Sequence, residues 1–150
     1  MPEAPDAIRL PVRRLDPTLP LPRQARPDDA GLDLHAAHDL TLEPGGRALV
    51  PTGIAVAIPP GHAGLVLPRS GLALEQGVTI LNAPGLIDAG YRGELKVLLI
   101  NHDLRAAVTL HRGDRIAQLV LVRVERVQPI AVDALPASER GEGGFGSTGA

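Results

Sequence analysis

Short runs of alternating or β-branched apolar residues recur along the chain, and turn residues separate them. Runs of this kind, spaced about ten residues apart, predict strands. The expected strands are Ala7–Arg13, Leu32–Ala36, Arg47–Pro51, Ile54–Ile58, Ala63–Leu67, Val78–Asn82, Gly93–Asn101, Ala107–His111 and Ile116–Val127. Sequences typical of turns lie between several of them: EPGG, PPGH, APG and RGD.

Helical periodicity is almost absent from the chain. No segment places apolar residues at i, i+3, i+4 and i+7 between capping residues, so the pattern predicts no helix. Many short strands joined by tight turns are typical of an all-β sandwich, jelly roll or barrel. No internal repeat or linker interrupts the pattern, which predicts one domain.

The composition narrows the class of protein. The chain has 150 residues, of which 44% are hydrophobic, so it can bury one core. It has no cysteine, which excludes disulfides and thiolate metal sites. The N-terminus lacks the features of a secretory signal and no apolar run is long enough to span a membrane, so we expect a cytoplasmic protein without a membrane partner. A net charge of −2 argues against sequence-independent nucleic-acid binding.

Two features of the composition point toward ligands. Tyr91 and Phe145 are the only residues among Phe, Trp and Tyr, and both lie in Gly-rich, polar surroundings. Aromatic rings usually belong to the core, but rings on such loops are free to stack on a flat ligand such as a base. All basic residues except Lys96 are arginine, which fits either codon bias or the binding of oxyanions.

Two segments combine polar groups with tight turns. In GLIDAGYRGELKV (85–97), a short strand, a turn and a second strand would bring Asp88 and Tyr91 to one cleft, although Asp is also common in solvated turns. In PRSGLA (68–73), an arginine, a hydroxyl and a glycine suit phosphate oxygen atoms. Each signal alone fits either a ligand site or an ordinary loop.

Three further segments carry polar residues in unusual places. Gln118 in GDRIAQL and Asp33 in AGLDL interrupt apolar strands, where each needs a partner, a ligand or a metal. The Gly-rich end, PASERGEGGFGSTGA (136–150), has the composition of a disordered tail, yet its backbone amides can also form an anion-binding loop.

The order of these motifs resembles the trimeric dUTPase family. AGLDL, PRSGLA, NAPGLIDAGYRGELKV, GDRIAQL and RGEGGFGSTG follow one another from Ala30 to Gly149, nearly the whole chain. The resemblance implies an all-β, dUTPase-type (β-clip-like) jelly roll that assembles as a homotrimer. It also implies a core of residues 1–135 and a flexible C-terminal arm, 136–150, that closes a neighbouring subunit's active site.

The resemblance further implies hydrolysis of dUTP to dUMP and diphosphate, which limits uracil incorporation into DNA and supplies dUMP for thymidylate synthesis. Asp88 matches the general base that activates a water against the α-phosphorus. Mg²⁺ would bridge the phosphates, and Asp33 would contact it through water. The substrate-binding positions implied are Arg69, Ser70, Gly71, Asn82, Gly85, Leu86, Ile87, Tyr91, Lys96, Gln118, Arg140, Phe145, Gly146, Ser147 and Thr148.

Two alternatives to this enzyme remain at the level of sequence. A dCTP deaminase on the same fold would need a catalytic Glu near position 98, where this chain has Leu98. A non-catalytic, nucleotide-binding regulatory trimer would dispense with Asp88 or the arm, yet both are present. Turnover of dUTP, ammonia release from dCTP, and binding without turnover distinguish the three.

Overall fold

The structure, a computed structural model, describes residues 7–146 and 149. These residues form ten strands and one short helix. The strands are β1 (Val12–Arg14), β2 (Leu32–His35), β3 (Leu40–Leu42), β4 (Arg47–Val56), β5 (His62–Leu67), β6 (Val78–Ile80), β7 (Gly85–Ile87), β8 (Glu94–Asn101), β9 (Val108–Leu110) and β10 (Arg115–Arg123), and the helix is α1 (Ser70–Gln76).

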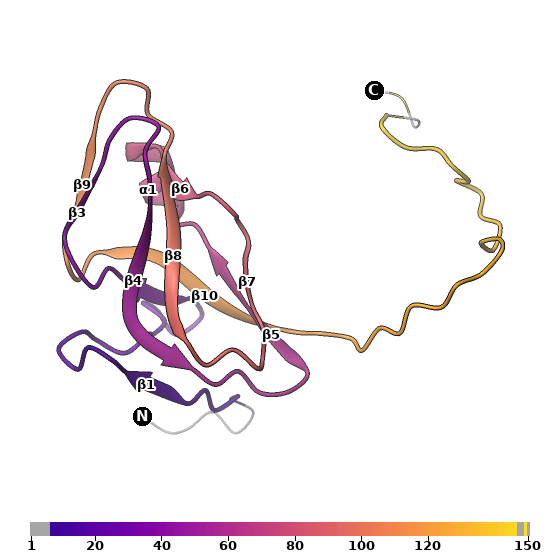
Figure 1. Cartoon of the computed structure of the whole chain (residues 1–150), viewed down its shortest axis with the longest axis horizontal. Coiled ribbons are helices and arrows are strands. Elements are labelled where there is room, and N and C mark those ends of the chain that lie inside the picture. Colours follow the sequence, from indigo (N-terminus) through magenta and orange to yellow (C-terminus); the bar gives the residue numbers. More distant parts are fainter. Residues whose placement is uncertain (1–6, 147–148, 150) are drawn as a thin grey trace.

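The strands make two antiparallel sheets and a separate ribbon (Figure 1). One sheet has the order β1-β4-β8-β6, and the other has the order β2-β10-β5-β7. β3 pairs only with β9 among the described residues. Because sequential strands often lie in different sheets, segments far apart in sequence meet at the surface.

One apolar core lies between the two sheets. Val50, Val97 and Leu99 from the first sheet and Leu34 and Leu119 from the second belong to a single buried cluster, and each is at most 1% exposed. Aliphatic, largely β-branched side chains fill this space without any aromatic ring, as the composition predicts. Burial of this apolar surface is the main source of stability.

A cluster of hydrogen bonds ties the segment after β1 to the turn between β9 and β10. The hydroxyl and amide of Thr18 donate to the Asp16 carboxylate at 2.6 and 3.0 Å, and Arg112 Nη2 donates to it at 2.7 Å. These donors favour the ionised form and lower the pKa of Asp16 to about 2. The cluster therefore anchors the long connection that leads to β2.

The structure corrects the predicted elements in several places. Helix α1 was not expected; it is a short surface helix with no buried residue, so apolar periodicity gave no signal. β3, a strand of three residues, was not predicted either. The two strands expected on either side of Thr52 are one continuous strand, β4, and the predicted first strand begins only at Val12.

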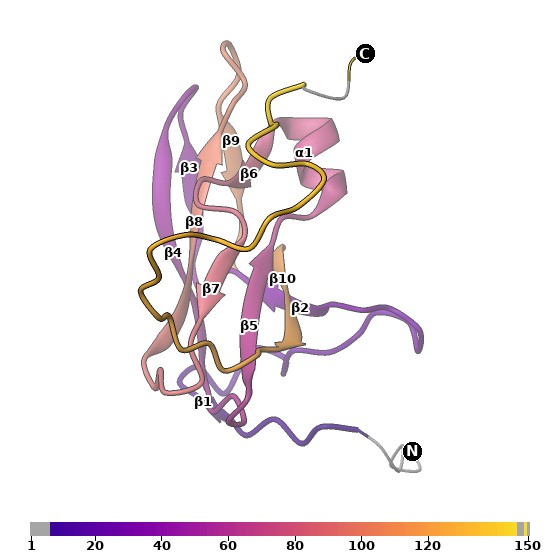
Figure 2. The same cartoon turned by 90° about the vertical axis from the view of Figure 1, so that its right-hand side faces the viewer.

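Beyond β10 the chain leaves the two sheets. The expected last strand, Ile116–Val127, ends at Arg123, and residues 124–146 contain neither helix nor strand. Figure 1 shows this segment extending far from the sheets, and in Figure 2, turned by 90°, it passes in front of them. Among residues 7–146 and 149, no helix has the length and apolar character that crossing a bilayer requires.

Candidate functional site

The turn between β7 and β8 presents Asp88 and Tyr91. The Tyr91 amide donates a hydrogen bond to the Asp88 carbonyl at 3.1 Å. Arg92 Nη1 donates to the carbonyl oxygens of Ala89 and Tyr91, at 2.6 and 3.0 Å. β7 is fixed on its other side by pairing with β5. Hydrogen bonds from the Tyr91 amide and the Arg92 side chain therefore hold the turn in one conformation.

The Asp88 carboxylate is accessible to solvent. Within residues 7–146 and 149, no group donates a hydrogen bond to it and no cation forms an ion pair with it. Both oxygen atoms are thus available to a water molecule or a ligand, as a general base requires.

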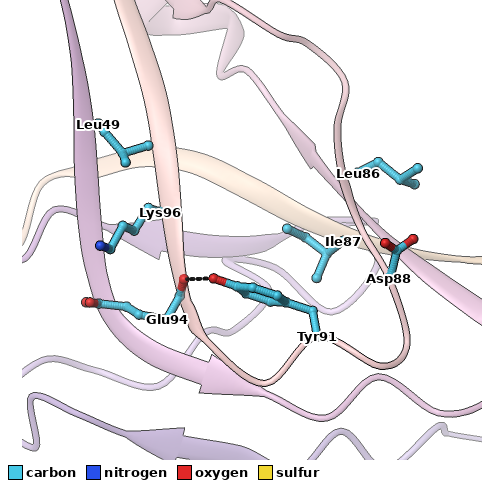
Figure 3. Close-up of a pocket in the computed structure, with 7 residues that line it drawn as sticks. All are labelled: Leu49, Leu86, Ile87, Asp88, Tyr91, Glu94 and Lys96. Atoms are coloured by element: carbon cyan, nitrogen blue, oxygen red, sulfur yellow. Dashed lines mark hydrogen bonds between the residues drawn. The ribbon is translucent and has the colours of Figure 1, made fainter.

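A cavity of about 440 Å³ lies beside this turn, and Figure 3 shows the side chains that line it. Asp88 and Leu86 lie on one side, and Lys96 lies on the other. The Tyr91 ring lies between them, and its hydroxyl donates to the Glu94 carbonyl at 2.9 Å. The lining residues are Leu49, Leu86, Ile87, Asp88, Tyr91, Glu94 and Lys96. A carboxylate, an ammonium group and an apolar wall thus share one hollow.

Gly93 makes the position of the Tyr91 ring possible. A Cβ atom at residue 93 would lie 2.5 Å from the Tyr91 hydroxyl oxygen, closer than any normal contact. The ring folds back over the glycine, and its hydroxyl reaches the backbone of β8. Tyr91 remains 45% exposed in the single chain, so its face is accessible to a ligand.

A smaller hollow of about 160 Å³ adjoins the same hairpin. It is lined by Asn82 and Gly85 and shares Leu86, Ile87 and Lys96 with the larger cavity. The predicted base- and sugar-binding residues of the hairpin are therefore neighbours in space.

A second group of predicted residues meets at the other end of β5. Arg69 ends the connection from β5 to α1, and Gln118 lies on the adjacent strand β10. Gln118 Nε2 donates to the Pro68 carbonyl at 3.0 Å, and Arg69 Nη1 donates to the Arg115 carbonyl at 3.0 Å. The loop is therefore fixed by side chains of the neighbouring strand.

Asp33 lies between two guanidinium groups. Its oxygen atoms are 4.0 Å from Arg69 Nε and 3.4 Å from Arg115 Nη1, and its side chain is 15% exposed. Pairing with two arginines offsets the cost of partly burying this carboxylate. Burial lowers the pKa of the nearby His35, although Asp33 opposes this effect, so His35 adds no charge here at neutral pH.

These residues line a cavity of about 630 Å³, which we call the cradle. The lining residues are Ala25, Arg26, Asp29, Ala30, Gly31, Asp33, Leu67, Arg69, Ser70, Gly71, Arg115, Gln118 and Val120. Gly31 allows the chain before β2 to approach Gln118, because a Cβ atom there would lie 2.4 Å from Gln118 Oε1. The lining contains three arginines and two aspartates, so its net charge is positive and suits an anion.

In the tail, the predicted substrate-binding residues that the structure describes are exposed to solvent. Arg140 Nε donates to the Gly143 carbonyl at 2.7 Å, which closes a local turn. Phe145 is fully exposed, and Gly146 follows it at the surface. Ser147 and Thr148 lie outside the described residues. Neither Arg140 nor Phe145 lines the hairpin cavity or the cradle of its own chain.

The hairpin cavity and the cradle share no lining residue. Continuing the pairing of Gly64 with Ile87 places Asp88 beside Ala63. Arg69 lies six positions later along the chain, two of them beyond the end of β5, so at about 3.3 Å per residue the backbones of residues 63 and 69 are at most about 20 Å apart. The single chain therefore places Asp88 and Arg69 in two different cavities.

Several residues of these cavities were not singled out from the sequence. Arg115 lies within the GDRIAQL motif, where only Gln118 stood out as a polar interruption of an apolar strand. Leu49 lines the hairpin cavity from β4. Because it is an apolar residue in an apolar strand, its sequence position gives no indication that it lines a cavity. No group of three or more His, Asp or Glu side chains gathers as a metal site in the part of the chain that the structure describes.

A two-sheet β fold with an exposed carboxylate on a hairpin and a separate arginine-lined cavity is the arrangement expected of a jelly-roll protein that binds a phosphorylated ligand. The profile of the dUTPase family matches residues 18–149. The chain therefore belongs to the dUTPase family, the dUTP diphosphatases, as its motifs indicated.

Relatives with this activity are similar over most of their length. Deoxyuridine 5'-triphosphate nucleotidohydrolase from Thermobifida fusca is 61% identical over 95% of this chain and 79% of its own length. The Mycobacterium tuberculosis protein of the same name is 57% identical over 93% of this chain and 94% of its own length.

Solved structures agree with the predicted jelly-roll fold. The dUTPase of Staphylococcus bacteriophage 80alpha, solved with dUpNHpp, superposes with a TM-score of 0.88 at 31% identity and covers 96% of this chain and 100% of that one. A mutant dUTPase of phage phi11 of S. aureus, described with a structural Mg(II) ion, gives a TM-score of 0.80 at 28% identity over 87% of this chain and 100% of that one.

Proposed function

We propose that the chain hydrolyses Mg-dUTP by in-line attack of an Asp88-activated water on the α-phosphorus, at sites shared between the subunits of a homotrimer. In the cell this reaction would limit uracil incorporation into DNA and supply dUMP for thymidylate synthesis. One observation carries the proposal: in one chain the free carboxylate of Asp88 and the arginines of the cradle line two cavities that share no residue. A site built from two copies brings them together.

Asp88 is the proposed general base. Its carboxylate is accessible and has no hydrogen bond or ion pair with any described residue, so it is free to accept a proton from water. The hydrogen bonds of Arg92 and of the Tyr91 amide hold the turn, so the carboxylate is positioned before substrate arrives.

The hairpin is the proposed base and sugar pocket. Asn82 and the backbone from Gly85 to Asp88 offer donors and acceptors for the uracil edge. Crowding there would reject a methyl group at C5, and mismatched hydrogen bonds would reject cytosine. The Tyr91 ring would pack under the deoxyribose and exclude a 2′-hydroxyl group. Lys96, from the facing strand, would contact the phosphates.

The cradle is the proposed phosphate site of a neighbouring subunit. Arg69, Ser70 and Gly71 offer a guanidinium, a hydroxyl and backbone amides, and Gln118 offers its amide. Mg²⁺ is usually held by one or two carboxylates together with phosphate oxygen atoms and water. Asp33 is a single carboxylate that is already paired with two arginines, so it would contact an ion that arrives with the triphosphate through water and not as a direct ligand. Bound there, the ion would neutralise phosphate charge.

The exposed tail supports an assembly of several chains. Residues 124–135 carry five exposed aliphatic side chains and no strand, and such side chains are stabilised when a partner covers them. They are Val124, Val127, Ile130, Val132 and Leu135. Residues 136–150 of the third subunit would then form a flexible arm that closes the site between the other two. In this arm Arg140 would clamp phosphate and Phe145 would stack on uracil. Gly146, Ser147 and Thr148 would complete the contacts.

A substrate panel tests the proposal. Purified protein with Mg²⁺ should release dUMP and diphosphate from dUTP, and it should act weakly on UTP, dTTP and dCTP. Ammonia release from dCTP would instead indicate a deaminase, and binding of dUTP without turnover would indicate a regulatory protein.

Asp88→Asn should lower kcat by a factor of about 10² or more, because it removes the general base. Binding of dUMP should stay within about twofold of the wild type, since the amide preserves shape and the base contacts are elsewhere. An unchanged kcat would exclude Asp88 as the base.

A further inference from the structure

We propose that Arg26 is a further phosphate-binding residue of the cradle and supplies its net positive charge; this inference rests on the proposed function. Arg26 belongs to the loop before β2 and to none of the motifs noted in the sequence. The structure nevertheless places it in the wall of the 630 Å³ cavity, together with Arg69, Ser70 and Gln118.

The loop that carries Arg26 is held in place by its own hydrogen bonds. The Arg26 amide donates to Asp29 Oδ2 at 2.9 Å, and the Asp29 amide donates to the Arg26 carbonyl at 3.1 Å. Gln24 Nε2 also donates to the Asp29 carbonyl, and the Asp33 amide donates to the Arg23 carbonyl at 2.9 Å. The loop is therefore joined to β2 and presents Arg26 from a fixed backbone.

The other charged groups of the cradle have partners within the chain. Asp33 pairs with Arg69 and Arg115, and Asp29 accepts the Arg26 amide. The Arg26 guanidinium has no hydrogen bond or ion pair with any residue from 7 to 146 or with residue 149. It is the arginine of this cavity whose guanidinium keeps all of its donors available to a ligand.

The net charge of the cradle, which determines how well it binds a polyanion, depends on Arg26. Arg26, Arg69 and Arg115 face Asp29 and Asp33, which leaves one net positive charge in the lining. Without Arg26 the lining would be neutral. A planar guanidinium binds phosphate oxygen atoms through paired donors, so Arg26 should add affinity for the triphosphate and not for the nucleoside.

Arg26→Gln tests this role, because glutamine keeps a polar side chain and removes the charge. The matched control is Arg23→Gln, an exposed arginine of the same loop that does not line the cavity. Binding of dUMP and of dUpNHpp, a non-hydrolysable imido form of dUTP, would be measured by calorimetry with Mg²⁺. Inhibition by free diphosphate would be measured in parallel.

Arg26→Gln should weaken binding of dUpNHpp by about fivefold to fifteenfold, as expected for one charge-assisted hydrogen bond. Diphosphate inhibition should weaken by a similar factor, while dUMP binding stays within about twofold, which also reports correct folding. Arg26→Lys should recover part of the loss because it restores the charge, and Arg23→Gln should behave as the wild type.

Equal affinity of wild type and Arg26→Gln for dUpNHpp would overturn the role of Arg26 and leave the proposed function intact. An equal loss in Arg23→Gln would show a general field effect and would also overturn it. A wild-type chain that binds neither dUMP nor dUpNHpp would overturn the proposed function itself, and the role of Arg26 with it.

Discussion

Two inactive variants should restore activity when their subunits are mixed. Asp88→Asn lacks the proposed base on the hairpin, and Arg69→Ala lacks the proposed phosphate cation of the cradle. Since the two positions line separate cavities of one chain, the proposed site takes its hairpin from one subunit and its cradle from the next. A mixed trimer can therefore contain an intact pair.

The size of the recovery follows from the geometry of a threefold ring. At a one-to-one ratio, half of the hairpins and half of the cradles are intact. If they assort randomly, about one quarter of the sites contain both, so activity should return to about a quarter of the wild-type value. If the hairpin and the cradle of the same chain worked together, no mixture would exceed the activity of its components.

The assay combines the two variants in denaturant, refolds them together and measures diphosphate release from dUTP with Mg²⁺. Each variant refolded alone gives the background, and wild-type protein taken through the same steps gives full recovery. Activity no higher than the background, in mixtures shown by mass spectrometry to contain both subunits, would refute the shared site.

Three further outcomes follow from the structure. Ending the chain after Ser138 should leave the oligomer folded, as judged by its melting temperature, but strongly reduce kcat/KM for dUTP; full activity would show that the arm is dispensable. Gly31→Ala should displace Gln118 by crowding, destabilise the fold by about 1–3 kcal/mol in denaturant unfolding, and raise KM. Asp16→Asn should lower the melting temperature at pH 7. Because the pKa of Asp16 is lowered from 3.8 to about 2, its stabilisation is present above pH 4 and lost toward pH 2, so the difference from wild type should vanish there.

Local pattern accounts for most of the strands but not for their exact extent. Alternating runs identified the two sheets' main strands because one face of each strand is buried. Helix α1 left no trace because it has no fully buried residue: Leu72 packs only partly against the core, and Leu74 is 88% exposed. β4 continues through Thr52 because the Thr52 hydroxyl donates to the Leu95 carbonyl at 2.6 Å, which satisfies a buried polar group.

The sequence by itself determined the family, because five short motifs in a fixed order specify the hairpin, the phosphate loop and the tail. Only the tertiary structure decided how these motifs are grouped. Pairing of β5 with β7 puts Asp88 and Arg69 at opposite ends of one ladder, while β2 and β10 bring Asp33, Gln118 and Arg115 together. Arg26 joins them through a loop that has no motif. The physical reason is that sequence spacing fixes which residues are available, whereas strand register and sheet order fix which of them meet.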